Sequence, residues 1–257
     1  MIEIERRGGG LWIFMNRPDV LNALHPAMIA AINQALDVAA EESDLRAIVL
    51  SGRGRAFCAG ADMKYNQSVS GLPGGNTAFV RAVSELTIRL ETFPLPVLAT
   101  INGTAVAGGL ELALGCDLII ASSSAKLGDM HSNYSLFPGG GASVRLTRRI
   151  GAPQAKRLMF WGETVAASRA QEIGLVDMVL ADEQLHDHVD DLVSKLADKS
   201  PLVLRRLKSA INRAGDMDAR LALEWERDTN ELHSHSHDRA EGLRAFVEKR
   251  RPNFLGR

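Results

Sequence analysis

The sequence predicts an α/β fold with mainly parallel strands. Short apolar runs rich in Val and Ile alternate with longer segments in which apolar residues recur at helical spacing. Breaks such as Gly52-Arg53-Gly54 and Pro94-Leu95-Pro96 separate these runs. Because strands joined through helices in this order usually pair in parallel, we expect layered α/β architecture.

The first half of the chain carries the alternating elements. The apolar run 11–15 reads as a strand that ends at Asn16-Arg17-Pro18. Segment 26–42 reads as a helix because Met28, Ile32 and Leu36 lie on one face. Thr77 is expected to cap a later helix. In chain order we expect a strand at 11–15, a helix at 26–42, a strand at 47–51, a mobile loop at 66–76, a helix from 77 to about 90, and strands at 97–101, 118–121 and 125–128.

The second half is mostly helical from Gly141 onward. Breaks fall at Gly151-Ala152-Pro153, Gly162 and Gly174, and the only strand signal is the run 176–180. Four amphipathic helices are expected, at 182–198, 201–214, 217–233 and 237–250. A helical portion of this size can cover an active site, form an oligomer interface, or do both.

Composition excludes several classes of protein. The chain has 257 residues, is 46% hydrophobic and carries a formal net charge of −1. This length suits one large domain, and the charge gives no basis for nucleic-acid or membrane-surface partners. No apolar run approaches the roughly 20 residues that span a bilayer. Cys58 and Cys116 are the only cysteines and residues 1–7 do not read as a signal peptide, so we expect free thiols in a reducing cytoplasm.

Two glycine-bearing segments carry the strongest chemical signal. They are 56–64 (AFCAGADMK) and 102–112 (NGTAVAGGLEL). Each follows a β-type run, and Gly108-Gly109 opens a helical pattern whose first turn contains Glu111. Together they can aim two backbone N–H groups at one oxygen, as an oxyanion hole does. Alternatively, the glycines only permit close helix–strand packing and Glu111 only complements the helix dipole.

A histidine cluster is the one candidate metal site. His233 and His237 are four residues apart and would share a helix face, with His235 between them. The segment is hydrophilic and offers no defensible third ligand, so we interpret it as a solvated helix end. We expect no metal site and no bound cofactor.

Short motifs run in a consistent order along nearly the whole chain. Any one is weak alone, but the ordered set resembles the enoyl-CoA hydratase/isomerase family, also called the crotonase family. The motifs that carry this resemblance are 16–18 (NRP) with 21–24 (LNAL), 56–64, 102–113, 116–117 (CD), 138–141 (PGGG), 145–146 (RL), 170–176 (AQEIGLV) and 241–250 (EGLRAFVEKR).

The resemblance implies a crotonase-like spiral of ββα units followed by a helical trimerisation region. We therefore expect an α/β core with the acyl-CoA site over 1–195, and helices over 196–257 that form oligomer contacts and close the CoA site. The family implies trimers or dimers of trimers and an acyl-CoA thioester substrate. Coenzyme A then belongs to the substrate rather than being a cofactor.

The resemblance also assigns site residues. The N–H groups of Ala61 and Gly108 would hold the thioester oxygen as it gains enolate charge, and Glu111 matches the first catalytic glutamate of the family's hydratases. The remaining positions that match the family's CoA contacts are Leu21, Ala23, Arg55, Ala59, Ala61, Asp62, Met63, Lys64 and Gly108, with Phe246 and Lys249 reaching CoA from the C-terminal region, often of a neighbouring subunit.

Two positions depart from the family pattern. Asp19 stands where some members have a lysine near the CoA phosphates, so that contact is expected to be absent or moved. His131 stands where hydratases have their second glutamate, seven residues before Pro138. A Glu–His pair can divide acid and base roles, as can two carboxylates. Otherwise His131 is only a polar residue of the pocket wall.

Three functions remain open from the sequence. Glu111 and His131 jointly add or remove water, as in a hydro-lyase acting on an enoyl-CoA. Alternatively, one of them is the lone base for a double-bond shift, C–C cleavage or decarboxylation through the same enolate, with Asp129 as a spare carboxylate. The third is a non-catalytic acyl-CoA-binding relative. Residues 65–80 and 130–137 are expected to line the acyl pocket.

Overall fold

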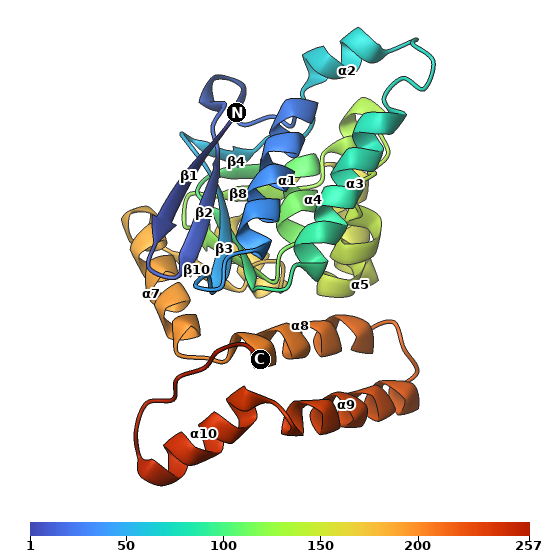
Figure 1. The fold of residues 1–257 in the computed structure, drawn as a ribbon. Coiled ribbons are helices and arrows are strands. Elements are labelled where there is room, and N and C mark those ends of the chain that lie inside the picture. Colours follow the sequence, from blue (N-terminus) through green and yellow to red (C-terminus); the bar gives the residue numbers. More distant parts are fainter.

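Two β-sheets with helices around them form the body of the protein, as Figure 1 shows. The computed structural model describes residues 1–257. One sheet has six strands in the order β1-β2-β3-β5-β7-β10, and the other has four in the order β4-β6-β8-β9. The strands are β1 (Ile2–Arg7), β2 (Gly10–Met15), β3 (Ala47–Gly52), β4 (Ala56–Cys58), β5 (Val97–Ile101), β6 (Thr104–Val106), β7 (Leu118–Ser122), β8 (Lys126–Gly128), β9 (Thr164–Ala166) and β10 (Met178–Leu180).

Ten α-helices and three short 3-10 helices complete the chain. The α-helices are α1 (Pro26–Ala40), α2 (Met63–Val69), α3 (Thr77–Thr92), α4 (Gly108–Leu114), α5 (Ala142–Trp161), α6 (Ala167–Glu172), α7 (Leu185–Ala197), α8 (Pro201–Ala214), α9 (Ala219–Ser234) and α10 (His237–Glu248), and the 3-10 helices are η1 (Pro18–Val20), η2 (His131–Tyr134) and η3 (Asp182–Gln184).

The six-stranded sheet is buried on both faces. Strands β2, β3, β5, β7 and β10 pair in parallel, and only β1 runs antiparallel to its neighbour. Every residue of β2, β3 and β5 is buried, because helices cover both faces of a parallel sheet. On one face, Ile13 and Leu50 join the main core with Leu36 of α1 and Leu86 of α3. This confirms the expected parallel α/β layering.

The opposite face of this sheet packs against α7. Trp12, Val49 and Leu98 form a second cluster with Val189 and Val193. Trp12 Nε1–H also donates to Asp190 Oδ1 at 2.9 Å, which satisfies the indole nitrogen at the edge of the cluster. Helix α7 is therefore part of the body of the protein.

The four-stranded sheet holds the segments that matter for the site. Strands β4, β6 and β8 are parallel, and each spans only a few residues. The chain leaves β4 into the loop before α2, leaves β6 directly into α4, and leaves β8 into η2. Because parallel strands end at the same edge, these three exits lie together.

Most predicted elements are confirmed, with small shifts at their ends. The segment 66–76 is not all loop, because residues 66–69 belong to α2. Asp62 begins that helix, accepting hydrogen bonds from Lys64 N and Tyr65 N at 3.1 and 3.2 Å. Thr77 is the first residue of α3 rather than its cap. The cap position is Asn76, whose side chain makes no capping hydrogen bond.

The break predicted at 151–153 is a kink inside α5. Gly151 adopts φ 76° and ψ 156°, which no helical residue has, and Pro153 then begins the second half of the helix. The breaks at Gly162 and Gly174 are confirmed, since each follows the end of a helix with positive φ. The short strands β4, β6 and β9 are absent from the predicted elements.

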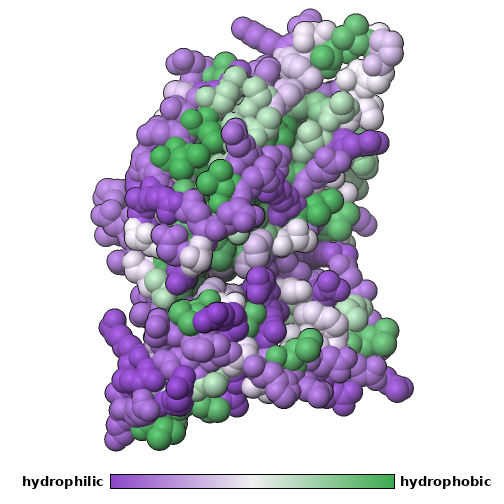
Figure 2. All heavy atoms as spheres, viewed as in Figure 1, coloured by the Kyte–Doolittle hydropathy of each residue, from purple (hydrophilic) through white to green (hydrophobic).

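Helices α8, α9 and α10 extend below the sheets in Figure 1. Their amphipathic pattern was predicted, and α9 has no buried residue. Figure 2 shows hydrophobic residues exposed along this lower part. The most exposed include Ile211, Leu232, Phe246 and Val247, at 70%, 68%, 84% and 78%. No helix is long and apolar enough to cross a membrane.

Candidate active site

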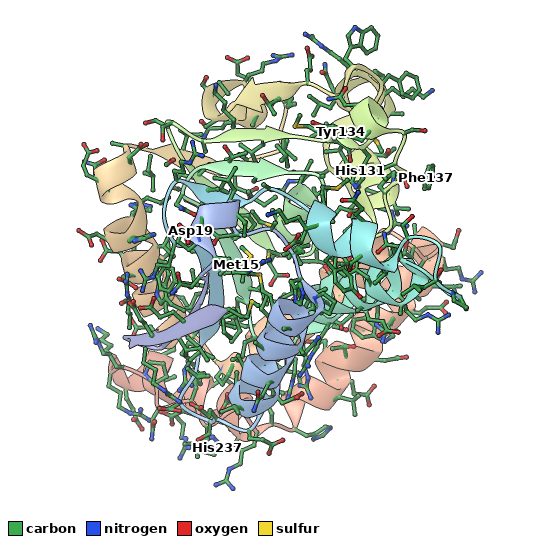
Figure 3. The ribbon with its side chains drawn as sticks, turned by 90° about the horizontal axis from the view of Figure 1, so that it is seen from above. Met15, Asp19, His131, Tyr134, Phe137 and His237 are labelled. Atoms are coloured by element: carbon green, nitrogen blue, oxygen red, sulfur yellow. The ribbon has the colours of Figure 1, made fainter.

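A cavity of about 340 Å³ opens where the exits of β4, β6 and β8 meet α3. Its walls are mainly apolar, with Phe79 and Val83 from α3 and Leu24 from the loop before α1. Residues from both predicted segments line it: Asn66, Asn76, Phe79 and Val80 from 65–80, and Met130, His131, Tyr134, Leu136 and Phe137 from 130–137. In Figure 3, the labelled His131, Tyr134 and Phe137 lie close together. The structure thus brings these two segments to one cavity.

The two glycine-bearing segments meet at the cavity. A Cβ built on Gly60 would lie 3.0 Å from Ala107 Cβ, and one built on Gly108 would lie 3.7 Å from Ala61 N. Gly109 has a different role, because its Cβ would lie 2.1 Å from Cys58 O. Gly109 therefore serves close packing of α4 on β4, whereas Gly108 lines the cavity.

The N–H groups of Ala61 and Gly108 are left available by the local backbone. On either side of Ala61, Leu24 N donates to Gly60 O at 2.7 Å and Asp62 N donates to Leu24 O at 2.9 Å. Ala61 N–H itself has no backbone acceptor. Gly108 is the first residue of α4, so its N–H has no acceptor within the helix. Both residues line the cavity.

Ala107, which precedes Gly108, holds a strained conformation. Its φ of 49° and ψ of −121° lie where residues with a Cβ are rare. The Ala107 N–H donates to Gly128 O at 3.1 Å, which fixes the turn to β8. This sharp turn between β6 and α4 sets the direction of the Gly108 N–H. Such backbone strain costs about 1–3 kcal/mol and concentrates at functional sites.

Glu111 is a buried carboxylate held on one side only. Its side chain is 3% exposed. Oε1 accepts hydrogen bonds from Gly140 N at 2.7 Å and Ala142 N at 3.1 Å, so the start of α5 fixes one oxygen. Oε2 lies 4.0 Å from His131 Nε2 and accepts no hydrogen bond from the protein. The second oxygen is therefore the one that faces other groups of the cavity.

His131 is oriented by the buried carboxylate of Asp129. His131 Nδ1 lies 2.9 and 3.1 Å from the two oxygens of Asp129, and the His131 backbone N–H donates to Oδ1 at 3.2 Å. A carboxylate only accepts hydrogen bonds, so Nδ1 carries a proton. Asp129 is 1% exposed and cannot turn toward the cavity without breaking these bonds. Nε2 is left to face Glu111.

Burial and charge set the protonation of this pair. Burial raises the pKa of Glu111, and its hydrogen bonds from Ala142 and Gly140 with the nearby His131 only partly oppose this. Burial lowers the pKa of His131, but the hydrogen bond and charge of Asp129 together with the charge of Glu111 outweigh it, so the net shift is upward. Because each partner favours the other's charged form, the pair is suited to proton transfer.

Several predicted CoA-contact residues lie together beside the cavity. Ala59 N donates to Leu21 O at 3.0 Å, and Leu21 adopts a left-handed φ of 52°. Arg17 joins the two loops, donating to Ala23 O at 2.7 Å and to Asp62 Oδ2 at 2.8 Å. The Asp62 carboxylate is thus committed to Arg17 and to capping α2. Ala59 and Met63 line the cavity itself.

The basic residues predicted to approach CoA phosphates remain uncommitted. Arg55 and Lys64 are exposed, and neither forms an ion pair. Asp19 lies exposed in η1, and Figure 3 shows it well apart from His131. Within one chain, Phe246 and Lys249 are not brought to the cavity. Phe246 lies in the last turn of α10 and Lys249 caps it, and α10 is at the opposite end of the molecule from α2 in Figure 1.

Three residues of this site were not singled out from the sequence, although two of them lie in the segment 65–80 that was expected to line the pocket. Asn66 and Asn76 line the cavity, yet a lone asparagine in a polar segment carries no distinguishing signal. The third residue is Gly140, which packs against Glu111: a Cβ at Gly140 would lie 2.8 Å from Glu111 Oε2. The Pro-Gly-Gly-Gly motif at 138–141 includes Gly140, but it did not predict that Gly140 contacts Glu111. No group of three or more His, Cys, Asp or Glu side chains is arranged to bind a metal ion.

Comparison with known proteins now identifies the family. The model of the enoyl-CoA hydratase/isomerase family matches residues 5–257. The chain belongs to the enoyl-CoA hydratase/isomerase family. It is 33% identical to the 2,3-dehydroadipyl-CoA hydratase of Escherichia coli, over 99% of this chain and 98% of that protein. It is also 33% identical to the crotonyl-CoA hydratase of Syntrophomonas wolfei, over 95% of this chain and 94% of that one.

Solved structures of the enoyl-CoA hydratase/isomerase family share the fold. An enoyl-CoA hydratase from Bacillus anthracis superposes with a TM-score of 0.94 at 35% identity, covering 100% of this chain and 99% of that one. One from Geobacillus kaustophilus gives 0.91 at 38% identity, covering 100% and 98%. The crotonase-like α/β fold predicted from the motifs is confirmed, and the protein is an enzyme of this family.

Proposed function

We propose that this enzyme hydrates the α,β double bond of an enoyl-CoA thioester and dehydrates the 3-hydroxyacyl-CoA in reverse. The observation that carries the proposal is the Glu111–His131 pair, whose Oε2 and Nε2 atoms lie 4.0 Å apart in the cavity. Hydration needs one group to take a proton from water and another to deliver a proton to carbon. A pair of unlike acid–base groups provides both.

The thioester oxygen would bind between the N–H groups of Ala61 and Gly108. As water attacks C3, electron density moves to this oxygen and an enolate forms. Two N–H donors that are already oriented stabilise that charge without reorganising during the reaction. This assignment is supported by the Ala61 N–H, which has no backbone acceptor, and by the Gly108 N–H, which is free because Gly108 begins α4.

The charges of the pair favour one division of roles. Carboxylate Glu111 and imidazolium His131 stabilise each other, since His131 lowers the pKa of Glu111 and Glu111 raises that of His131. A separation of 4.0 Å allows one water, with hydrogen bonds of about 2.8 Å, to contact both side chains. In this arrangement Glu111 is the base and His131 is the acid.

In this mechanism the two side chains supply and accept all the protons that the reaction needs. Glu111 takes a proton from water, the water oxygen forms the bond to C3, and the C2–C3 π electrons move into the enolate. When the enolate collapses, the proton on His131 Nε2 passes to C2. The enzyme is left with protonated Glu111 and neutral His131, and a proton passes from one to the other before the next turnover.

The CoA moiety would run from the cavity along the Leu21–Ala23 and Ala59–Lys64 loops. The exposed, unpaired Arg55 and Lys64 are available to its phosphates. We also propose a homo-oligomer, a trimer or dimer of trimers, in which Phe246 and Lys249 contact CoA bound to a neighbouring subunit. The exposed apolar residues of α8–α10 support association.

A panel of enoyl-CoA esters tests the proposal. We expect loss of the enoyl absorbance together with a product heavier by one water. A product of unchanged mass with a shifted double bond would contradict hydration and favour isomerisation. Binding of CoA esters without turnover of any would indicate a non-catalytic relative.

A further inference from the structure

Two asparagine side chains in the cavity wall have unsatisfied oxygens. The Oδ1 atoms of Asn66 and Asn76 are shielded from water and accept no hydrogen bond. Both residues line the same cavity as Glu111 and His131. A buried carbonyl oxygen without a donor costs about 1–3 kcal/mol, so two in one wall call for an explanation.

The side-chain amide of Asn76 makes no hydrogen bond, although Asn76 stands where such an amide ordinarily caps a helix. Asn76 occupies the cap position of α3, where asparagine ordinarily accepts a hydrogen bond from the first turn of the helix. Here its side chain makes no such bond. The amide is therefore not used to stabilise α3. Because both oxygens are shielded, they reach the cavity only after a turn of the amide, which the broad χ2 of Asn66 and of Asn76 allows.

Asn66 lies on the helix that forms the neighbouring part of the wall. It belongs to α2, which with the following turn leads to Asn76 and stands at one end of the molecule in Figure 1. Around the two amides, the wall is apolar, including Met63, Phe79 and Val80. A purely apolar acyl chain would leave both amides unpaired.

We propose that Asn66 and Asn76 select an acyl group that carries a neutral hydroxyl. A hydroxyl both donates and accepts, so two amides can satisfy it completely. A carboxylate-bearing acyl group is disfavoured, because no Lys or Arg lines the cavity and the charge of His131 is already balanced by Glu111. This specificity rests on the proposed function, since it takes the cavity to be the acyl site.

The test compares esters that differ by one hydroxyl. The substrates are trans-2-hexenoyl-CoA and its 4-, 5- and 6-hydroxy counterparts, assayed by kcat/KM. We expect the best hydroxylated ester to exceed the parent by about tenfold, which corresponds to about 1.4 kcal/mol for one satisfied amide. Asn66→Leu and Asn76→Leu should each reduce that ratio by about tenfold, chiefly by raising kcat/KM for the parent and lowering it for the hydroxylated ester.

Gln67→Leu is the matched control, because Gln67 is exposed on α2 and does not line the cavity. It should leave the ratio unchanged. A wild-type preference for the parent ester, or an unchanged ratio in both asparagine variants, would overturn the proposal. Calorimetric affinities for saturated hexanoyl-CoA and its 4-, 5- and 6-hydroxy counterparts should show the same ratios. These affinities test the selectivity even if no ester is hydrated. Absence of hydration would contradict only the proposed function.

Discussion

His131 Nε2 faces Glu111 Oε2 at 4.0 Å, while the opposite ring nitrogen of His131 is bound to Asp129 at 2.9 Å. The contact with Asp129 sets the direction of the ring and keeps a proton on Nδ1, which leaves Nε2 facing Glu111. The sequence left Asp129 open as a replacement catalytic group, but these contacts place it to position His131 instead. Its effect should appear through His131.

Replacing Asp129 by Asn should move the pH profile of activity. In the proposed mechanism hydration requires the Glu111 carboxylate, so activity should fall at low pH through a pKa that burial raises above 4.5. The proposed mechanism also requires imidazolium His131, so activity should fall at high pH through a pKa raised above 6.5. Without the Asp129 charge, burial lowers the pKa of His131, and the alkaline limb should shift to lower pH.

The measurement is kcat/KM for an enoyl-CoA between pH 5 and 10, with Asp187→Asn on the exposed side of α7 as the control. The two limbs belong to the coupled pair rather than to single residues. An alkaline limb that stays at the wild-type pH in Asp129→Asn would contradict the positioning role.

Substituting Gly140 by Ala should displace the Glu111 carboxylate. The added Cβ would lie 2.8 Å from Oε2 and 2.9 Å from Cδ of Glu111. Misplacing a catalytic group by about 1 Å typically costs about 10²-fold in rate. We expect a loss of that order in kcat, measured alongside the thermal midpoint. Gly215→Ala, where a Cβ meets nothing within 4 Å, should retain full activity.

Relieving the backbone strain at Ala107 should stabilise the protein. Glycine adopts a φ of 49° freely, so Ala107→Gly removes strain of about 1–3 kcal/mol at an entropic cost of about 0.5–1 kcal/mol. We expect the free energy of unfolding in urea to rise by about 1 kcal/mol. Ala113 lies inside α4 without this strain, so Ala113→Gly should lower the free energy of unfolding. Destabilisation by Ala107→Gly would show that the turn is unstrained.

The chain should associate through its C-terminal helices. Exposed residues such as Ile211, Leu232 and Phe246 would leave too much apolar surface on a monomer. Light scattering coupled to gel filtration should give the mass of three or six protomers. A Phe246→Ser variant should weaken association, while Val38→Ser on α1 should not. A monodisperse monomer at micromolar concentration would contradict this prediction.

Sequence periodicity predicted the long elements because their burial follows one face. Helices α1, α3 and α7–α10 and the strands β2, β3, β5, β7 and β10 lie close to their predicted ranges. Of the four-stranded sheet, only β8 was predicted, at 125–128. The strands β4, β6 and β9 span three residues each and show no period of their own. The four-stranded sheet, which brings the three exits together, therefore could not be predicted from local pattern.

The candidate site residues were named from the sequence, but their contacts were not. Ordered motifs pointed to Ala61, Gly108 and Glu111, and the departure from the family pattern pointed to His131. The bond from Asp129 to His131 depends on a loop conformation that spacing does not determine. Likewise, the hydrogen bonds of Gly140 and Ala142 to Glu111 join segments about 30 residues apart through tertiary packing.

Hydration rates of Glu111→Gln, His131→Gln and the double variant test the central claim most directly. If the two side chains share the proton transfers, each single variant should lose about 10²–10⁴-fold in kcat with crotonyl-CoA. The double variant should lose far less than the product of the two, because residues that act as a unit are not additive. Near wild-type hydration by His131→Gln would contradict the account, since Glu111 would then work without its partner.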